Sequence, residues 1–205
     1  MTGGAAVGYS HAGFTDIVGV DIASQPHYPF AFVQADALQY LRDHGKEFGA
    51  IHASPPCQWI THAAAQWRKA GKVYPELVQP TREALRATGV PYVIEQPVGQ
   101  VLESPIKLNG ALFGLRVKRD RYFECSWPLD MPLLLGEERP AKMGRPFDAR
   151  KGELFYPVGH FSGVAEARAA MGIDWYMTQK EVAQAIPPDY TFFVGTALLR
   201  ELHRG

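Results

Sequence analysis

A cysteine, a glutamate and an arginine lie beside predicted strands and together could activate a pyrimidine ring. Cys57 follows two prolines directly after the apolar segment 49–54, and these prolines stiffen the backbone and remove two amide donors before the thiol. Glu95 ends the next apolar segment, and Arg121 opens a third. Open α/β sheets carry their chemistry at the carboxyl ends of strands. We therefore predict a site in which a Cys57 thiolate attacks an electron-poor ring carbon.

Each of these residues also has a simpler possible role. A buried cysteine is most often a small hydrophobe, but the proline pair before Cys57 favours a nucleophile. Glu95 could be a solvated strand end, or it could hold a base edge and protonate a ring nitrogen, which would require a raised pKa. Arg119 and Arg121 are expected on one face of a strand. Arg121 is the better candidate for binding a pyrimidine carbonyl oxygen, and Arg119 is as readily a solvated side chain.

Glycines and acids near the start of the chain form a second group of candidate residues. Gly3 and Gly4 precede a short predicted helix, while Asp21 and Asp36 each end a separate apolar strand. An acid at such a strand end can accept from the ribose hydroxyls of a nucleoside cofactor, and the next one from an adenine amino group. The glycine pair alone is a weak signal, so the prediction of a nucleoside site depends on the two acids.

Composition is that of an ordinary globular protein. The 205 residues suit one domain, or one domain with a small appendage, with 46% hydrophobic residues, 20% charged residues and a net charge of zero. No apolar run is long enough to span a bilayer, so no membrane partner is expected. Two cysteines without metal-like spacing favour a reducing cytoplasm, and seven scattered histidines indicate no metal site.

Strands alternate with helices along most of the chain, which predicts βαβ units and a mostly parallel sheet. Helices are expected at residues 37–44 and 76–87. A third helix is expected to begin at a capping box formed by Thr178 and Glu181, and a last one to be capped by Asp189 and to run through Leu202. Residues 126–171 are rich in proline, glycine and basic side chains, and they predict a small irregular insertion. The basic residues 139–151 are candidates for contact with a nucleic-acid backbone. The loop with Trp59, His62 and Trp67 could touch a base, but such residues more often pack a loop onto the protein body.

Four segments, in this order, resemble motifs of the DNA (cytosine-5) methyltransferases. They are Pro55-Pro56-Cys57-Gln58, Glu95-Gln96-Pro97, Arg119-Asp120-Arg121 and Thr178-Gln179-Lys180-Glu181 with Pro187. The glycines from Gly3 to Gly13 are similar to the tail of the family's S-adenosylmethionine-binding motif. The resemblance covers residues 3–125 and 175–197. It implies an α/β, Rossmann-like, mostly parallel methyltransferase domain at 1–125 and 172–205, with the insertion 126–171 in place of a target-recognition domain.

The resemblance also implies an activity: transfer of a methyl group from S-adenosylmethionine to carbon 5 of cytosine in DNA, through a covalent cysteine adduct. The implied catalytic residues are Cys57, Glu95, Arg119 and Arg121. The implied cofactor contacts are Gly3, Gly4, Asp21, Ile22, Asp36, Ala37, Pro55, Gly195 and Thr196. The implied nucleic-acid contacts are Pro56, Gln58, Gln96, Arg139 and Arg145. A prokaryotic or phage setting is expected, and the oligomeric state is not indicated.

The chain departs from the family pattern at several points. Only two residues precede Gly3, so we expect the family's first strand to be encoded upstream of the recorded start. A damaged cofactor site and completion by another chain are the alternatives. Gln96 stands where the family has asparagine, and Gly195-Thr196-Ala197 is a reduced form of its last motif. The small insertion leaves four other functions open: an enzyme for RNA, an enzyme for free pyrimidine nucleotides, a catalytically impaired base-binding relative, and an enzyme that uses a modified S-adenosylmethionine.

Overall fold

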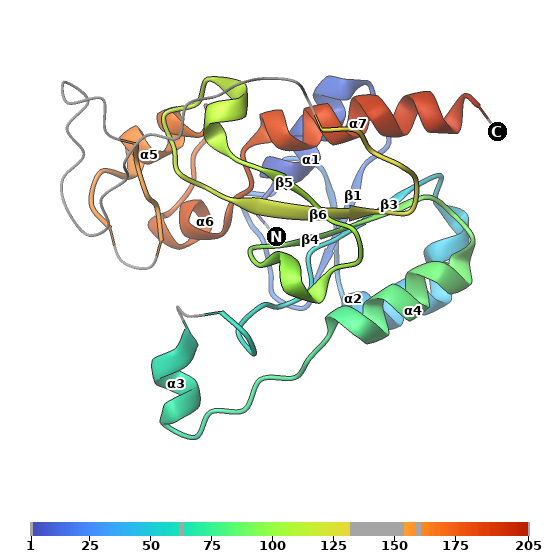
Figure 1. The fold of residues 1–205 in the computed structure, drawn as a ribbon, viewed down its shortest axis with the longest axis horizontal. Coiled ribbons are helices and arrows are strands. Elements are labelled where there is room, and N and C mark those ends of the chain that lie inside the picture. The colour runs from blue at the N-terminus through green and yellow to red at the C-terminus, as the bar shows by residue number, and fades with distance from the viewer. Residues whose placement is uncertain (1, 62–63, 132–153, 159–160, 205) are drawn as a thin grey trace. The chain divides into compact units, whose positions relative to one another are not determined.

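The computed structural model describes residues 2–61, 64–131, 154–158 and 161–204 and shows a mixed α/β protein with mostly parallel strands (Figure 1). The chain divides into two compact units, each described by itself below. The first unit consists of Met1–Ala35, Leu108–Asp120 and Met131–Gly205, and the second of Asp36–Lys107 and Arg121–Asp130. Across the described ranges, no helix has the length and apolar character needed to cross a membrane.

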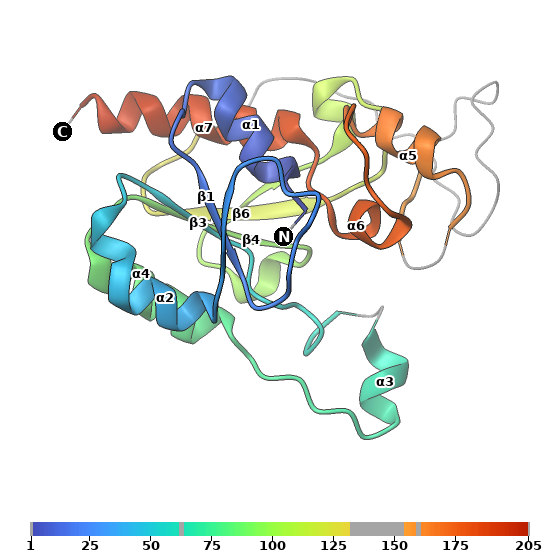
Figure 2. The same cartoon turned by 180° about the vertical axis from the view of Figure 1, so that it is seen from behind.

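In the first unit, two helices from opposite ends of the sequence pack together. Helix α1 (Gly4–Ala12) lies alongside α7 (Pro188–Leu202), as both cartoon views show (Figures 1 and 2). The close approach depends on Gly8, because a Cβ there would lie 2.1 Å from the carbonyl oxygen of Pro188. The same unit holds a parallel strand pair, β1 (Val18–Asp21) with β2 (Ala31–Gln34).

The C-terminal helices of the first unit surround an apolar core. The buried members of this core include Val117, Phe155, Ala167, Met171, Met177 and Val182. Helix α6 (Gln179–Gln184) begins with the predicted capping box, in which Thr178 and Glu181 satisfy each other's backbone amides. The predicted Asp189 cap is wrong: α7 begins at Pro188, whose missing amide suits the first helical position, and Asp189 lies in the first turn.

Helix α5 (Val164–Ala170) was not predicted, since the whole stretch 126–171 was expected to be irregular. Residues 132–153 and 159–160 lie outside the described residues, so the extent of the insertion stays a prediction.

The second unit contains a four-stranded sheet in the order β3-β4-β6-β5. These strands are β3 (Ile51–Ala53), β4 (Tyr92–Gln96), β6 (Arg121–Cys125) and β5 (Ile106–Leu108). β3 and β4 are parallel, and β4 and β6 are antiparallel. Every residue of β4 is buried, including the polar Glu95 and Gln96 that follow its apolar first three residues.

Helices α2 (Ala37–His44) and α4 (Val78–Thr88) pack side by side on this sheet (Figures 1 and 2). Their core residues are Leu41, Val78 and Leu85, together with Tyr92, Ile94 and Leu102. A buried ion pair reinforces the packing, since Arg82 donates from Nε and Nη2 to the two carboxylate oxygens of Glu124, at 2.8 and 2.7 Å. Such a two-point contact fixes α4 against β6, the strand that begins with Arg121.

The remaining elements are short. They are α3 (Ala65–Lys69) and the 3-10 helices η1 (Gly45–Glu47), η3 (Gly99–Val101) and η4 (Gly110–Phe113).

Candidate active site

Cys57 lies in a fixed turn just beyond the carboxyl end of β3. The chain leaves β3 through Pro55 and Pro56, and the carbonyl of Cys57 then accepts from the amides of Ile60 and Thr61, at 3.1 and 3.0 Å. The cysteine is half-buried and carries a free thiol. Since prolines hold one side of Cys57 and a hydrogen-bonded turn the other, the backbone has little freedom to move the thiol.

Gln96 fastens this loop to the neighbouring strand. Because β3 and β4 run in parallel, with Ala53 opposite Ile94, both strands end at the same edge of the sheet. The Gln96 Nε2 there donates to the carbonyl oxygen of Pro55, at 2.6 Å. Gln96 is 1% exposed, and its Oε1 atom has no hydrogen-bond partner among the described residues. The side chain of Gln96 therefore reaches the Cys57 loop; contact of Gln96 with nucleic acid stays a prediction.

Glu95 and Arg121 form an ion pair on one face of the sheet. Glu95 is paired with Phe123 across the antiparallel β4–β6 ladder, so Arg121, two residues earlier, is its diagonal neighbour on the same face. The Arg121 Nε lies 2.8 Å from Glu95 Oε1, although the alignment falls short of a hydrogen bond. Both side chains are mostly buried, at 7% exposure for Glu95 and 15% for Arg121. Removal from water strengthens the attraction between them.

Electrostatics link this pair to the cysteine. Burial is the main cause that raises the pKa of the Cys57 thiol above 9.0, and the negative charge of Glu95 raises it further. The positive charge of Arg121 and a hydrogen bond from Thr61 oppose this rise in pKa. The three predicted residues Cys57, Glu95 and Arg121 are thus close enough to act on one another. In the protein alone the thiol is protonated at neutral pH, so a nucleophilic role requires a change in its surroundings when a substrate binds.

Arg119 belongs to the first unit and does not share a strand face with Arg121, because β6 begins only at Arg121. That prediction was wrong. Arg119 is 2% exposed and donates to three backbone carbonyls. These acceptors are Ala185 at 2.9 Å, Pro157 at 2.9 Å and Ala183 at 2.7 Å. The contacts give Arg119 a structural role in joining the segment at Pro157 to the C-terminal end of α6, while a part in the reaction stays a prediction.

The predicted cofactor residues of the first unit fall into two groups. Gly4 and Gly195 are required by helix packing: a Cβ would meet the carbonyl oxygen of Ile186 at 2.1 Å and the ring of Tyr9 at 2.9 Å, respectively. Gly3 has φ +85° at the start of α1, a conformation that favours glycine. Thr196 donates to the carbonyl of Phe192 within α7.

Asp21 and Ile22 lie at the end of β1. Asp21, the last residue of β1, accepts from the amide of Ala23 at 2.9 Å and from Gln25 Nε2 at 3.2 Å. Ile22 beside it is 72% exposed. Contact of Asp21 and Ile22 with a cofactor stays a prediction.

Asp36, Ala37 and Pro55 belong to the second unit. Asp36 caps α2 by accepting from the amide of Gln39 at 2.9 Å, and Ala37 is the first residue of that helix. Any contact of these three residues with a cofactor stays a prediction.

Among the predicted nucleic-acid contacts, Pro56 and Gln58 are exposed in the Cys57 loop. Arg139, Arg145 and His62 lie outside the described residues. The expectation that Trp67 packs onto the protein body is wrong, since its side chain is 55% exposed.

Two residues near Cys57 were missed by the sequence interpretation. Thr61 hydrogen-bonds to Cys57 and lies four residues after it. Arg68 donates through Nη1 to the carbonyls of Gln58 and Thr61. The sequence offered one signal for Arg68: the stretch around it has no acid to pair with, so its guanidinium was free to bind backbone carbonyls.

Replacing Gln96 by leucine tests whether Gln96 fixes the loop. Leucine is similar in size but has no donor, so the carbonyl of Pro55 loses its partner. We expect the protected amides of Ile60 and Thr61 to exchange roughly 5- to 100-fold faster, because an unsatisfied buried acceptor is unfavourable by about 1–3 kcal/mol. Hydrogen exchange followed by mass spectrometry measures this change.

The matched control is Gln100→Leu, an exposed glutamine of the same unit, which should leave the exchange of the loop unchanged. If the loop amides of Gln96→Leu exchange as in the parent protein, Gln96 does not position Cys57.

Comparison with known proteins adds no further assignment. No family model matches the chain, and no curated protein matches it significantly.

Proposed function

We propose that the protein transfers a methyl group from S-adenosylmethionine to carbon 5 of a cytosine in DNA, with Cys57 as the nucleophile. The observation that carries the proposal is the grouping of a half-buried thiol, a buried carboxylate and a guanidinium at one edge of the sheet. Gln96 holds the thiol loop there. On this proposal the fold is the Rossmann-like one of the DNA (cytosine-5) methyltransferases.

Cys57 starts the reaction by passing its thiol proton to the Glu95 carboxylate and forming a bond from its sulfur to carbon 6 of the cytosine ring. The electron pair of the ring double bond shifts toward N3, where Glu95 supplies a proton or a strong hydrogen bond. Carbon 5 of the resulting enamine is nucleophilic. S-adenosylmethionine supplies an electrophilic methyl group when it is bound. After methylation, a base removes the proton from carbon 5, the ring double bond re-forms, and the bond to Cys57 breaks.

The charge arrangement explains why the thiol would react only when a base is present. Glu95 raises the pKa of Cys57 through its negative charge. When Glu95 shares a proton with N3, that charge is diminished and one cause of the raised pKa disappears. Arg121 stabilises both thiolate and carboxylate, and its fork of donors suits the carbonyl oxygen at position 2 of the ring.

The cytosine has to leave the base stack before Cys57 can reach carbon 6, because the ring faces of a stacked base are covered by its neighbours. The half-buried position of Cys57 agrees with a base that enters a confined site. Pro56 and Gln58, exposed on the same loop, are the proposed contacts to the DNA around the target.

Asp21 and Ile22 are the proposed contacts for the adenosyl part of the cofactor. We expect Asp21→Ala to weaken S-adenosylmethionine binding by roughly 10- to 100-fold, since a hydrogen bond to a charged group contributes about 1.5–3 kcal/mol. Titration calorimetry without DNA measures this affinity. Asp16→Ala removes an exposed acid of the same unit and should change nothing. Equal affinity of the Asp21→Ala variant and the parent would exclude this contact.

The proposed activity is tested with labelled S-adenosylmethionine and separate pools of DNA, RNA and free nucleotides, followed by mass spectrometry of the nucleosides. We expect 5-methylcytosine in DNA alone. If 5-methylcytosine forms in RNA or in free nucleotides instead, that molecule and not DNA is the substrate. No product in any pool would favour a base-binding relative without catalytic activity, and a heavier group on cytosine, found with a modified cofactor, would identify a different donor.

A further inference from the structure

The second unit carries an exposed arm immediately after the Cys57 loop. The α3 arm, residues 64–75, contains helix α3 and the turn that follows it. None of the five residues of α3 is buried, and the helix stands away from the sheet and from α4 in both cartoon views (Figures 1 and 2). Two apolar side chains of the arm are open to solvent, with Trp67 55% and Val73 89% exposed. Such side chains on a short helix without a core indicate a binding surface.

The arm is basic. It contains Arg68, Lys69 and Lys72 but no aspartate or glutamate, whereas the whole chain has equal numbers of acids and bases. Lys69 and Lys72 are exposed. The arm therefore presents a positive surface in a protein of zero net charge, which is complementary to a polyanion.

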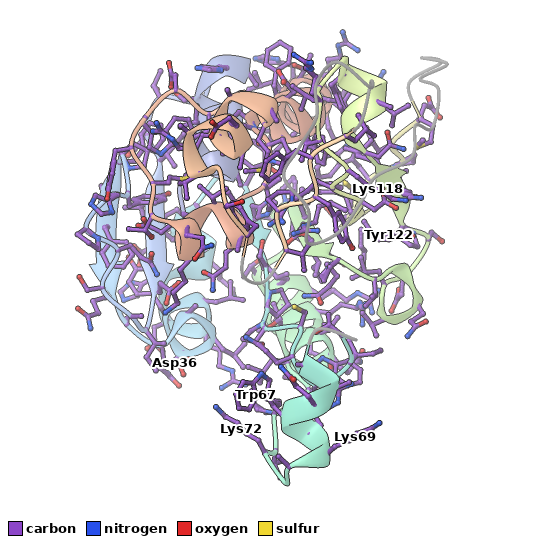
Figure 3. The ribbon with its side chains drawn as sticks, turned by 90° about the vertical axis from the view of Figure 1, so that its left-hand side faces the viewer. Asp36, Trp67, Lys69, Lys72, Lys118 and Tyr122 are labelled. Atoms are coloured by element: carbon purple, nitrogen blue, oxygen red, sulfur yellow. The ribbon has the colours of Figure 1, made fainter. Side chains whose placement is uncertain are left out.

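An aromatic and a cationic side chain share one side of this arm. The turn at Gly71, with φ +86°, brings the amide of Lys72 within 3.0 Å of the carbonyl of Trp67. Figure 3 shows Trp67 and Lys72 on the same side of α3 and Lys69 on the opposite side. The Lys72 Nζ also lies 5.4 Å from the ring centre of Tyr74. The Lys72 ammonium group is thus near the ring of Tyr74, and the Lys72 side chain lies on the same side of α3 as Trp67.

We propose that this side of the α3 arm binds an unpaired segment of DNA, with a base stacked on Trp67 and a phosphate bound by Lys72. The inference rests on the proposed function for its choice of DNA. Aromatic rings beside basic groups are the usual means of binding single strands, because every base has a face on which to stack. In a duplex those faces are covered by neighbouring bases, so stacking on Trp67 requires an unpaired base.

Arg68 connects the arm to the catalytic loop. Its Nη1 atom donates to the carbonyl of Thr61, at 2.9 Å, and to that of Gln58. Thr61 in turn hydrogen-bonds to Cys57. A strand held on Trp67 and Lys72 is therefore held by a segment that is joined, through Arg68, to the turn that carries the nucleophile. In a chain with a small insertion, the arm supplies a contact surface of its own for the substrate.

The test is fluorescence anisotropy of the full chain, without cofactor, with labelled single-stranded DNA, the matching duplex, and single-stranded RNA of the same sequence. We expect the single-stranded DNA to bind most tightly. Trp67→Ala should weaken it by roughly 5- to 100-fold, the range for loss of base stacking, and Trp67→Phe should retain part of it. Lys72→Gln should lower the salt dependence, with a slope reduced by about 0.7 for one lost phosphate contact.

Lys69→Gln is the matched control, because it removes a charge from the same helix on the side away from Trp67. It should weaken binding less than Lys72→Gln. Circular dichroism checks that each variant is folded, which is expected since Trp67, Lys69 and Lys72 are exposed.

Three results would overturn the inference: duplex bound as tightly as the single strand, RNA bound more tightly than DNA, or binding unaffected by Trp67→Ala. The outcome is separable from that for the proposed function, because binding is measured without cofactor and without turnover. Normal binding with no methyl transfer would refute the proposed activity and keep the α3 arm as a DNA contact. If methyl transfer occurs but DNA binding is unaffected by Trp67→Ala, the proposed role of the α3 arm is refuted and the proposed activity is kept.

Discussion

The Cys57→Ala variant is expected to lose methyl transfer while it still binds DNA. The variant lacks the sulfur that forms the bond to carbon 6, so the rate should fall by roughly four orders of magnitude or more, as for other removed nucleophiles. The rate of a single turnover, measured with excess protein and labelled cofactor, reports the chemical step alone. Anisotropy with the same DNA reports binding, which should stay within about twofold because the thiol itself contributes little to affinity.

Cys125→Ala is the natural control for this variant. Cys125 is the other cysteine of the second unit and ends β6. Burial, and to a smaller extent the charge of Glu124, raises the pKa of its thiol to about 12. This thiol is therefore unreactive at physiological pH, and its removal should leave turnover almost unchanged. A Cys57→Ala protein that still transfers methyl groups at a substantial rate would refute the covalent route.

Glu95→Gln should have the second-largest effect on the rate of methyl transfer. It should slow that reaction but speed up the alkylation of Cys57 in the free protein. In the reaction with DNA, loss of the proton donor at N3 should slow the chemical step by roughly 10²- to 10⁴-fold, the usual range for general acid catalysis. Without DNA, the variant lacks the negative charge that raises the pKa of Cys57. The lower pKa gives more thiolate at neutral pH, so a small alkylating reagent should modify Cys57 faster than in the parent protein.

The pH dependence of alkylation checks the sign of this effect. In the parent protein the rate should keep rising with pH beyond 9, because burial and Glu95 both hold the pKa of Cys57 above its usual value. In Glu95→Gln the same curve should shift to lower pH. Glu83→Gln, which removes an exposed acid of α4, should leave the curve in place. If the alkylation curve of Glu95→Gln shifts to higher pH, or if its chemical step keeps a near-normal rate, Glu95 does not have the proposed role.

Much of the fold could be predicted because its local signals agree with one another. Helix α2 begins and ends as predicted, since Asp36 caps an amphipathic stretch that stops before Gly45. The capping box of α6 is also confirmed. The strands that end with Asp21, precede Cys57 and contain Glu95 were identified by short apolar runs bounded by polar or proline residues, a pattern that depends only on neighbouring positions.

Features that depend on distant partners were not predictable. Nothing in the sequence shows that β6 pairs antiparallel with β4, yet this pairing makes Arg121 the diagonal neighbour of Glu95. Arg119 is only two residues away from Arg121, but it belongs to the first unit, where it donates to backbone carbonyls of Pro157, Ala183 and Ala185. Trp67 was expected to pack on the body, because a large aromatic side chain normally gains from burial.

The most direct test of the role of Cys57 is covalent capture on DNA that contains 5-fluorocytosine, in the presence of S-adenosylmethionine. Fluorine at carbon 5 cannot leave as a cation, so the elimination that would release Cys57 is blocked. We expect a complex of protein and DNA that survives denaturation, with the nucleotide joined to the peptide that contains Cys57, and no such complex with Cys57→Ala. Folded parent protein that forms no complex, or one joined through Cys125, would contradict the proposed mechanism.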